Sequence, residues 1–369
     1  MPLLLSCFML AACQHKAGKA AHPEGKLVPL KYAKGFTIRE NERYATVTVM
    51  NPWKEGSVYA KYYLVEDSAA ETPSDGTKVT VPLQSMAANS ATHLEFLQLL
   101  GVIDRVTGVC NPRYVYNPRI LQRVKDGQVK DLGDAFRIDI EQLLLLRPQA
   151  VMTSAYNADD ENSKKLRHTG ITLLYNIEWQ EENILGRAEW IKFIGAFYGQ
   201  SSKADSIFAE VERNYNWLKE KAKQAGGQPA ILSGEDFRGT WHIPAGRSFT
   251  AQLFRDAGAR YLYAEDTGKG SIPSDIENVL LQFKDADIWV GTQANTLKEL
   301  EAKNAQYRLF KAFREGNVYN YNRRTTAEGG NDYWESAVAR PDILLADLIK
   351  VLHPGLLPGH ELFYIQKLK

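Results

Sequence analysis

Two stretches of the chain share one pattern of polar and apolar positions. Residues 139–144 (Asp-Ile-Glu-Gln-Leu-Leu) lead into an apolar run at 150–153, and residues 275–280 (Asp-Ile-Glu-Asn-Val-Leu) lead into another at 287–291. Each stretch predicts a capped helix start with a glutamate in its first turn, a short helix and then a buried strand. We therefore expect two similar α/β lobes, each with one matched carboxylate.

Around these repeats, strand and helix patterns alternate along most of the chain. Short apolar runs bounded by glycine or polar residues predict strands, and apolar residues spaced every three or four positions predict helices. Strands separated by helices are typical of a parallel sheet covered by helices. The further elements expected are residues 78–83, 92–100, 106–109 and 171–175 in the first lobe, and 230–234, 250–259, 307–314, 317–321 and 342–352 in the second.

The pattern is helical between the lobes and β before them. Residues 203–223 have apolar residues at helical spacing and predict a helix of about 20 residues, roughly 30 Å long. Alternating runs at 44–50 and 58–65 predict an N-terminal hairpin or small sheet. The expected fold class is α/β: two lobes with parallel, helix-flanked sheets joined by one long rigid helix, plus an N-terminal β segment. The expected divisions are a lipoprotein signal and tether (1–25), the N-terminal β segment (26–77), the N-terminal lobe (78–183), the linking helices (184–227), and the C-terminal lobe and tail (228–369).

The first residues predict export and a lipid anchor. Residues 3–10 form a short apolar core that Ala11-Ala12-Cys13 follows. Small residues directly before a cysteine resemble the cleavage site of bacterial lipoproteins, in which the cysteine becomes the lipid-modified N-terminus. Cys13 is therefore the expected lipidation site, on the periplasmic side of a bacterial membrane. The alternative is a hydrophobic N-terminus that is never processed. If Cys7 is removed and Cys13 acylated, Cys110 has no cysteine partner.

Composition and spacing argue against several classes of function. A formal net charge of +1 gives no electrostatic reason to expect nucleic acid as a partner. The seven histidines are scattered without ligand spacing, so neither a metal bound by the protein itself nor a cofactor is expected. Neither a phosphate-cradling Walker spacing nor a G-x-S-x-G nucleophile motif occurs.

The order of motifs resembles one protein family. The predicted helix at 92–100 is followed by Gly101 and by residues 103–109 (Ile-Asp-Arg-Val-Thr-Gly-Val), and residues 140–151 combine a glutamate, a leucine-rich helix, a proline and a buried strand. Together with the long joining helix, this order is similar to the periplasmic substrate-binding proteins of ABC importers for cobalamin and ferric siderophores. The resemblance covers roughly residues 78–355.

The resemblance implies a monomeric, bilobed clamp that holds a metal chelate between its lobes and delivers it to an ABC permease dimer. In the family, one glutamate on the outer face of each lobe meets arginines of the permease. The matching positions here are Glu141 and Glu277, and Glu95 of the first motif is a weaker candidate.

A purely structural role for these glutamates is the alternative. Asp139 with Gln142, and Ser274 with Glu277, resemble capping boxes, and acidic residues in a first helical turn are favoured by the helix dipole.

Ligand contacts are expected in loops that follow the strands, because open α/β sheets bind ligands at the carboxyl ends of their strands. These loops are rich in aromatic residues, which offer rigid contact area, and in arginine, which binds anionic oxygens. The expected ligand-binding residues are Arg113, Tyr114, Tyr156, Arg238, Trp241, Arg323 and Trp334.

Two other functions stay open from the sequence alone. One is a chelate-processing enzyme, an esterase or chelatase, on the same scaffold, although no convergent set of nucleophile, base and oxyanion donors is visible. The other is a ligand-capture lipoprotein without a permease partner, in which the two glutamates would only stabilise their helices.

Overall fold

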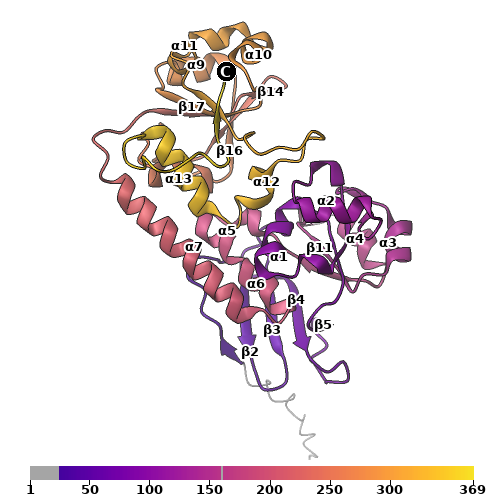
Figure 1. Cartoon of the computed structure of the whole chain (residues 1–369). Coiled ribbons are helices and arrows are strands. Elements are labelled where there is room, and N and C mark those ends of the chain that lie inside the picture. The colour runs from indigo at the N-terminus through magenta and orange to yellow at the C-terminus, as the bar shows by residue number, and fades with distance from the viewer. Residues whose placement is uncertain (1–24, 159–160) are drawn as a thin grey trace, which may run out of the picture.

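The computed structural model describes residues 25–158 and 161–369 and shows two α/β lobes, a long helix beside them and an N-terminal sheet (Figure 1). The expected lipidation site, Cys13, lies outside the described residues. In Figure 1 the purple N-terminal lobe and the orange C-terminal lobe meet near the short gold helix α12 (Asp332–Ser336), and α7 (Ser201–Ala222) runs along one side of both. The two-lobed α/β fold predicted from the sequence is confirmed.

The N-terminal segment is a five-stranded sheet in the order β1-β2-β3-β4-β5. The first four strands are antiparallel neighbours, and β5 lies parallel to β4. Residues 78–83 were expected to open the first lobe. Instead β5 forms the edge of this sheet, and the chain leaves it before Pro82, which has no N–H to continue a ladder. The strands are β1 (Lys26–Leu27), β2 (Phe36–Glu40), β3 (Ala45–Met50), β4 (Val58–Val65) and β5 (Thr77–Thr80).

Two buried carboxylates attach the N-terminal segment to the linking helices. Glu189 accepts hydrogen bonds from the backbone N–H groups of residues 31–33 at 2.8–3.1 Å. Glu181 accepts from the N–H groups of residues 34 and 35, and from the Trp190 indole at 3.0 Å. Because a buried carboxylate is costly unless its lone pairs are satisfied, these contacts fix the path of residues 31–35.

The N-terminal lobe is built on a five-stranded sheet in the order β12-β11-β6-β7-β8, and all of its neighbouring strands are parallel. Its short helices are connected to these strands as the alternating sequence pattern predicts. The strands are β6 (Met86–Ala88), β7 (Val106–Val109), β8 (Lys130–Asp131), β11 (Ala150–Thr153) and β12 (Thr172–Tyr175), with a small hairpin of β9 (Gly133–Asp134) and β10 (Arg137–Ile138); the helices are α1 (Leu94–Leu100), α2 (Pro118–Lys125), α3 (Ile140–Leu146) and α4 (Glu161–Arg167).

The C-terminal lobe has a four-stranded sheet in the order β13-β17-β18-β19, whose last strand is antiparallel and comes from the C-terminal tail. Buried Asp347 holds this tail, because it accepts the N–H groups of residues 363–365 at 2.6–3.0 Å. The strands are β13 (Ile231–Ser233), β17 (Ile288–Thr292), β18 (Val318–Asn320) and β19 (Gln366–Lys367), with a second sheet of β14 (Asp236–Phe237), β15 (Thr240–Pro244) and β16 (Ser271–Ser274); the helices are α8 (Phe249–Asp256), α9 (Ile276–Phe283), α10 (Leu297–Lys303), α11 (Lys311–Arg314), α12 and α13 (Pro341–Leu352).

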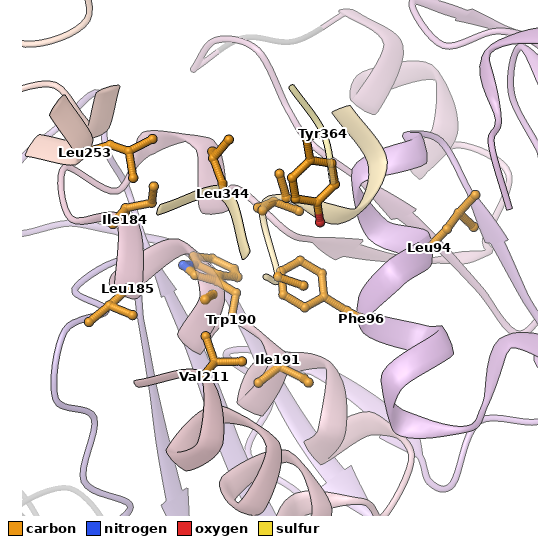
Figure 2. Packing of buried hydrophobic residues seen from close by; sticks show 14 of the residues in the cluster. Leu94, Phe96, Ile184, Leu185, Trp190, Ile191, Val211, Leu253, Leu344 and Tyr364 are labelled. Carbon is orange, nitrogen blue, oxygen red and sulfur yellow. The ribbon is translucent and has the colours of Figure 1, made fainter. Parts of the chain in front are cut away.

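Three linking helices join the lobes: α5 (Ile184–Glu189), α6 (Ile191–Phe197) and α7. At about 1.5 Å per residue, the 22 residues of α7 span roughly 33 Å, as the sequence predicts. Figure 2 shows that one buried core runs through this junction: Phe96 of α1, Trp190 and Ile191 at α6, and Leu344 of α13 lie close together. Since such a core resists deformation, the lobes are expected to move little relative to each other.

Candidate functional site

Aromatic and arginine side chains gather where the strands of the N-terminal lobe end. After β7, the Arg113 guanidinium lies over the Tyr114 ring, 4.5 Å from its centroid, and the Tyr114 side chain is 50% exposed. A row of three rings follows, with centroid distances of 4.7 and 6.2 Å: Phe136 in the turn of the β9–β10 hairpin, Tyr156 after β11 and Trp179 after β12. Neighbouring rings in this row are tilted by 37° and 33°, and together they offer an apolar contact surface.

The C-terminal lobe carries a second arginine–aromatic pair in the equivalent region. After β13, the Arg238 guanidinium lies 5.1 Å from the centroid of the Phe237 ring, which is 64% exposed. The loop after β18 brings exposed Arg323, and α12 brings Trp334, which is 60% exposed and packs edge-on against Tyr333. Six of the seven predicted ligand residues are therefore exposed, five of them in segments that follow strands and Trp334 in α12.

Trp241 does not share this placement. It lies in β15, is fully buried and stacks on Trp289 with ring centroids 5.7 Å apart. Its indole N–H donates to the Ser233 carbonyl at 2.8 Å. The alternation of β15 turns Trp241 and Ile243 inward and His242 outward. We therefore correct the expectation of ligand contact at this position: Trp241 belongs to the core of its lobe.

The loops at the strand ends also hold most of the unusual backbone. Four described non-glycine residues have positive φ, and three of them lie here: Asn111 (48°), Ala155 (44°) and Arg238 (56°). Such conformations cost free energy for residues with a side chain and persist only where the surroundings impose them. In these loops the backbone sets the direction in which Arg113, Tyr156 and Arg238 leave the chain.

Residues 324–335 of the C-terminal lobe clasp residues 114–117 of the N-terminal lobe. Glu335, which is 1% exposed, accepts the backbone N–H of Tyr116 at 2.7 Å and that of Asn117 at 3.3 Å. A side chain on Gly330 would collide with the Val115 carbonyl oxygen, 2.2 Å away, so only glycine permits this approach. We call this contact the interlobe clasp.

A charged cavity of about 360 Å³ lies beside the clasp and is lined by both lobes. Burial, with the charge of Asp332 as a smaller contribution, raises the pKa of Glu335 to about 8 and that of Glu95 to about 7. Arg324 binds Asp332 at 2.5 Å on the same wall. Glu95 therefore faces the junction between the lobes, which corrects its consideration as an outer docking residue.

Glu141 and Glu277 occupy one equivalent position at the outer ends of the two lobes, on α3 and α9 (Figure 1). Both side chains are exposed, and neither has a hydrogen bond or ion pair to another described residue. Each stands two residues after an aspartate that caps its helix. Asp139 accepts the Gln142 N–H at 3.0 Å, and Asp275 accepts the Asn278 N–H at 2.8 Å.

This geometry changes the expected capping of the second helix. The sequence suggested a box of Ser274 with Glu277, but Asp275 is the N-cap, and the Ser274 hydroxyl donates to the Asp275 carbonyl instead. Since aspartate is among the strongest N-cap residues, neither glutamate is needed to cap its helix. Capping therefore does not account for the two exposed carboxylates, whose local contribution is limited to their favourable interaction with the helix dipole in the first turn.

The described residues contain neither a metal-binding cluster nor a membrane-spanning helix. No group of three or more His, Cys, Asp or Glu side chains there is arranged to hold a metal ion. In the same part of the chain, no helix combines the length and the apolar character needed to cross a membrane.

Some residues at the strand ends were missed as individual candidates. Trp179 follows β12, and its indole donates to the Ser154 carbonyl at 3.1 Å, so it completes the aromatic row. Phe136 and Phe237 are both more than 60% exposed. The rule that ligands bind at the carboxyl ends of strands could have found all three, since Trp179 follows β12, Phe136 lies in the hairpin turn after β8, and Phe237 lies in the short strand β14 after β13.

One family model matches most of the chain, and relatives and solved structures are similar to it. A model described as "Periplasmic binding protein" matches residues 86–325. Two uncharacterized lipoproteins of Methanocaldococcus jannaschii are each 26% identical: one over 310 residues (81% of this chain, 72% of the relative) and one over 349 residues (89% and 86%).

Solved structures show the same fold at low identity. A haem-binding protein from Pseudomonas aeruginosa aligns with a TM-score of 0.59 and 16% identity over 78% of this chain and 98% of its own. The vitamin B12-binding protein of Vibrio cholerae gives 0.54 and 14% over 76% and 99%. A protein of an Fe³⁺-hydroxamate transport system from Saccharomonospora viridis gives 0.58 and 14% over 83% and 98%. The matched family and these neighbours are solute-binding and transport proteins.

Proposed function

Because the chain belongs to the periplasmic binding protein family, we propose that it captures a metal chelate between its lobes and delivers it to the permease of an ABC importer. The observation that carries this proposal is the presence of one arginine–aromatic pair on each lobe, Arg113 with Tyr114 and Arg238 with Phe237. Each pair follows a strand, is exposed and stands at or near a strained backbone position.

The chemistry of these pairs favours a bulky, flat or π-rich ligand with anionic oxygens. Aromatic faces bind such a ligand by contact area, and guanidinium groups bind carboxylate, hydroxamate or catecholate oxygens. The structurally similar proteins bind or transport haem, vitamin B12 and Fe³⁺-hydroxamate, which are all metal chelates of this kind. The metal would then arrive inside its chelator and need no ligands from the protein.

The proposed location is outside the cytoplasm, with the chain held at a membrane by a lipid on Cys13. Two lines support it: the small residues before Cys13, and the lipoprotein names of the two archaeal relatives. We further propose that Glu141 and Glu277 contact basic residues of the permease. Their support is their equivalent position, their exposure and the independent capping of both helices.

The test is a titration of the purified protein with haem, cobalamin, a ferric hydroxamate and a ferric catecholate. Visible absorbance and native mass spectrometry should show one of them bound at one molecule per chain. The Arg113→Ala/Arg238→Ala variant tests the two proposed arginines and should bind that ligand more weakly than the wild-type protein. If none of the four binds the wild-type protein, the proposed ligand class is wrong.

A further inference from the structure

Each proposed docking glutamate is followed, one helical turn later, by an unusually exposed leucine. Leu145 is 72% exposed and Leu281 is 77% exposed, and they are the two most exposed large apolar side chains in the described chain. Leu145 stands four residues after Glu141 on α3, and Leu281 stands four residues after Glu277 on α9. Residues four apart lie on one face of a helix, so each lobe presents a carboxylate and an isobutyl group side by side.

The two helices place the rest of this pattern in the same register. Leu143 and Val279, two residues after each glutamate, are buried and anchor the helices to their lobes. Leu144, which is 44% exposed, adds apolar surface on the first lobe, whereas its counterpart Leu280 is partly buried. Isolated exposed leucines are common on protein surfaces. Two leucines at the same helix position in both lobes are harder to explain by a role in folding. Side chains as exposed as Leu145 and Leu281 contribute little to the core of either lobe.

We propose that each docking site is a carboxylate–leucine pair, and that the permease meets it with a basic side chain beside an apolar socket. This inference rests on the proposed function, in which the two lobes dock onto a permease dimer. A partner with two similar halves suits two equivalent patches far apart on one chain. The leucine supplies contact that excludes water around the ion pair. An ion pair shielded from water is stronger than one open to solvent, because the local dielectric constant is lower.

The partner that fits these patches is the permease rather than a second copy of this chain. In a symmetric dimer of the protein, patches of one kind would bring carboxylates toward each other, and that contact is repulsive. A basic partner complements both patches at once. The carboxylate therefore selects the partner, and the leucine adds affinity without changing the charge.

The experiment measures how much ligand-loaded protein half-saturates the ATP hydrolysis of its importer in liposomes. Leu145→Ser/Leu281→Ser should raise that concentration about a hundredfold, since burying an exposed leucine is worth roughly tenfold in affinity at each site. The affinity for ligand should not change. The control is Leu27→Ser/Val58→Ser, which alters two half-exposed aliphatic residues of the N-terminal sheet and should leave the concentration unchanged. Leu145→Ile/Leu281→Ile should retain most of the wild-type response.

The outcomes separate this inference from the proposed function. If Glu141→Gln/Glu277→Gln impairs stimulation and the leucine variant matches the control, the carboxylates dock alone, so the inference is wrong and the proposed function stands. If neither variant impairs stimulation, docking through α3 and α9 is wrong altogether. If sedimentation shows a wild-type dimer that the leucine variant loses, the leucines serve self-association and the inference is overturned.

Discussion

The outer ends of the two lobes repeat one arrangement of residues, whereas their inner edges share an arginine–aromatic pair and otherwise differ. Outside, α3 and α9 repeat the same order of capping aspartate, isoleucine, glutamate and exposed leucine. Inside, the N-terminal lobe has the row Phe136–Tyr156–Trp179, and the C-terminal lobe has Tyr321 stacked on Tyr333 at 4.1 Å beside the clasp. Matched surfaces suit a partner with two similar halves, and unmatched surfaces suit a single ligand without that symmetry. The comparison predicts that changes outside affect delivery and changes inside affect capture.

Charge reversal outside should have the largest effect. Glu141→Lys/Glu277→Lys should abolish uptake of the ligand by cells, because two repulsive contacts replace two attractive ones at the permease. The matched control is Glu161→Lys, which reverses another exposed glutamate in the first turn of a helix and should leave uptake near the wild-type rate. Normal uptake by the double variant would remove the distinction between the outer and inner faces.

Two tryptophans sharpen the description of the inner edge. Trp241→Ala should lower the free energy of unfolding by about 3–5 kcal/mol, because it empties a buried site packed against Trp289. Trp334→Ala, at an exposed position, should change the free energy of unfolding little and weaken ligand binding instead. Denaturant unfolding and ligand titration on both variants check this contrast. Equal stability losses would mean that Trp334 is also a core residue.

The arginines of the two inner pairs should govern capture. Arg113→Ala/Arg238→Ala should weaken ligand affinity by roughly 10- to 100-fold, since each guanidinium contributes about 0.7–1.4 kcal/mol where it contacts an anion or a ring. Uptake at saturating ligand should stay near the wild-type rate because the outer face is intact. Single Arg→Lys variants test whether charge alone suffices. A variant with unchanged affinity would place the ligand elsewhere.

The smallest effect is expected at the interlobe clasp. Burial raises the pKa of Glu335 from 4.5 to about 8, so between these values the folded protein holds a proton that the unfolded chain releases. The free energy of unfolding should therefore fall as the pH rises from about 5 to 8, and level off above that range. The raised pKa of Glu95 also lowers the free energy of unfolding as the pH rises. Asp332 lines the same cavity, and its charge contributes to the raised pKa of both glutamates.

Glu335→Gln should flatten that pH dependence and make the protein more stable than wild type at pH 9, because the amide oxygen still accepts both N–H groups without a buried charge. Glu335→Ala should lose about 1–3 kcal/mol at pH 5, since it leaves the Tyr116 and Asn117 N–H groups unpaired, and this loss should shrink as the pH rises because the variant has no carboxyl to ionise. Thermal unfolding between pH 5 and 9 measures both. Parallel curves for wild type and Glu335→Gln would contradict the assignment of this pH dependence to Glu335.

Local patterns predicted the parts of the fold that local chemistry determines. The repeats at α3–β11 and α9–β17 and the long helix α7 lie where the spacing of apolar residues predicted them, because capping and amphipathic burial act over a few residues. The same holds for the arginine and aromatic positions at the strand ends. The period-two alternation of residues 240–244 was a signal that Trp241 is buried. The prediction instead treated Trp241 as part of the loop that precedes it.

Contacts between distant segments could not be predicted in this way. The clasp joins Glu335 to Tyr116 across 219 residues, and β5 pairs with β4 although its sequence also suits the first strand of a lobe. Neither partner carries a local signal for the other, because strand pairing and the capture of a backbone N–H depend on where the folded chain brings them. The exposure of Leu145 and Leu281 likewise became visible only once the core-facing sides of α3 and α9 were known.

The most direct test of the division between outer and inner faces is the ligand affinity of purified Glu141→Lys/Glu277→Lys protein. The measurement is an equilibrium titration with whichever of haem, cobalamin, ferric hydroxamate or ferric catecholate binds the wild-type protein. If the outer face serves only delivery, the dissociation constant should stay within about twofold of the wild-type value, since additivity holds for distant sites. A loss of affinity of tenfold or more would contradict the account, because it would place the two glutamates in ligand capture.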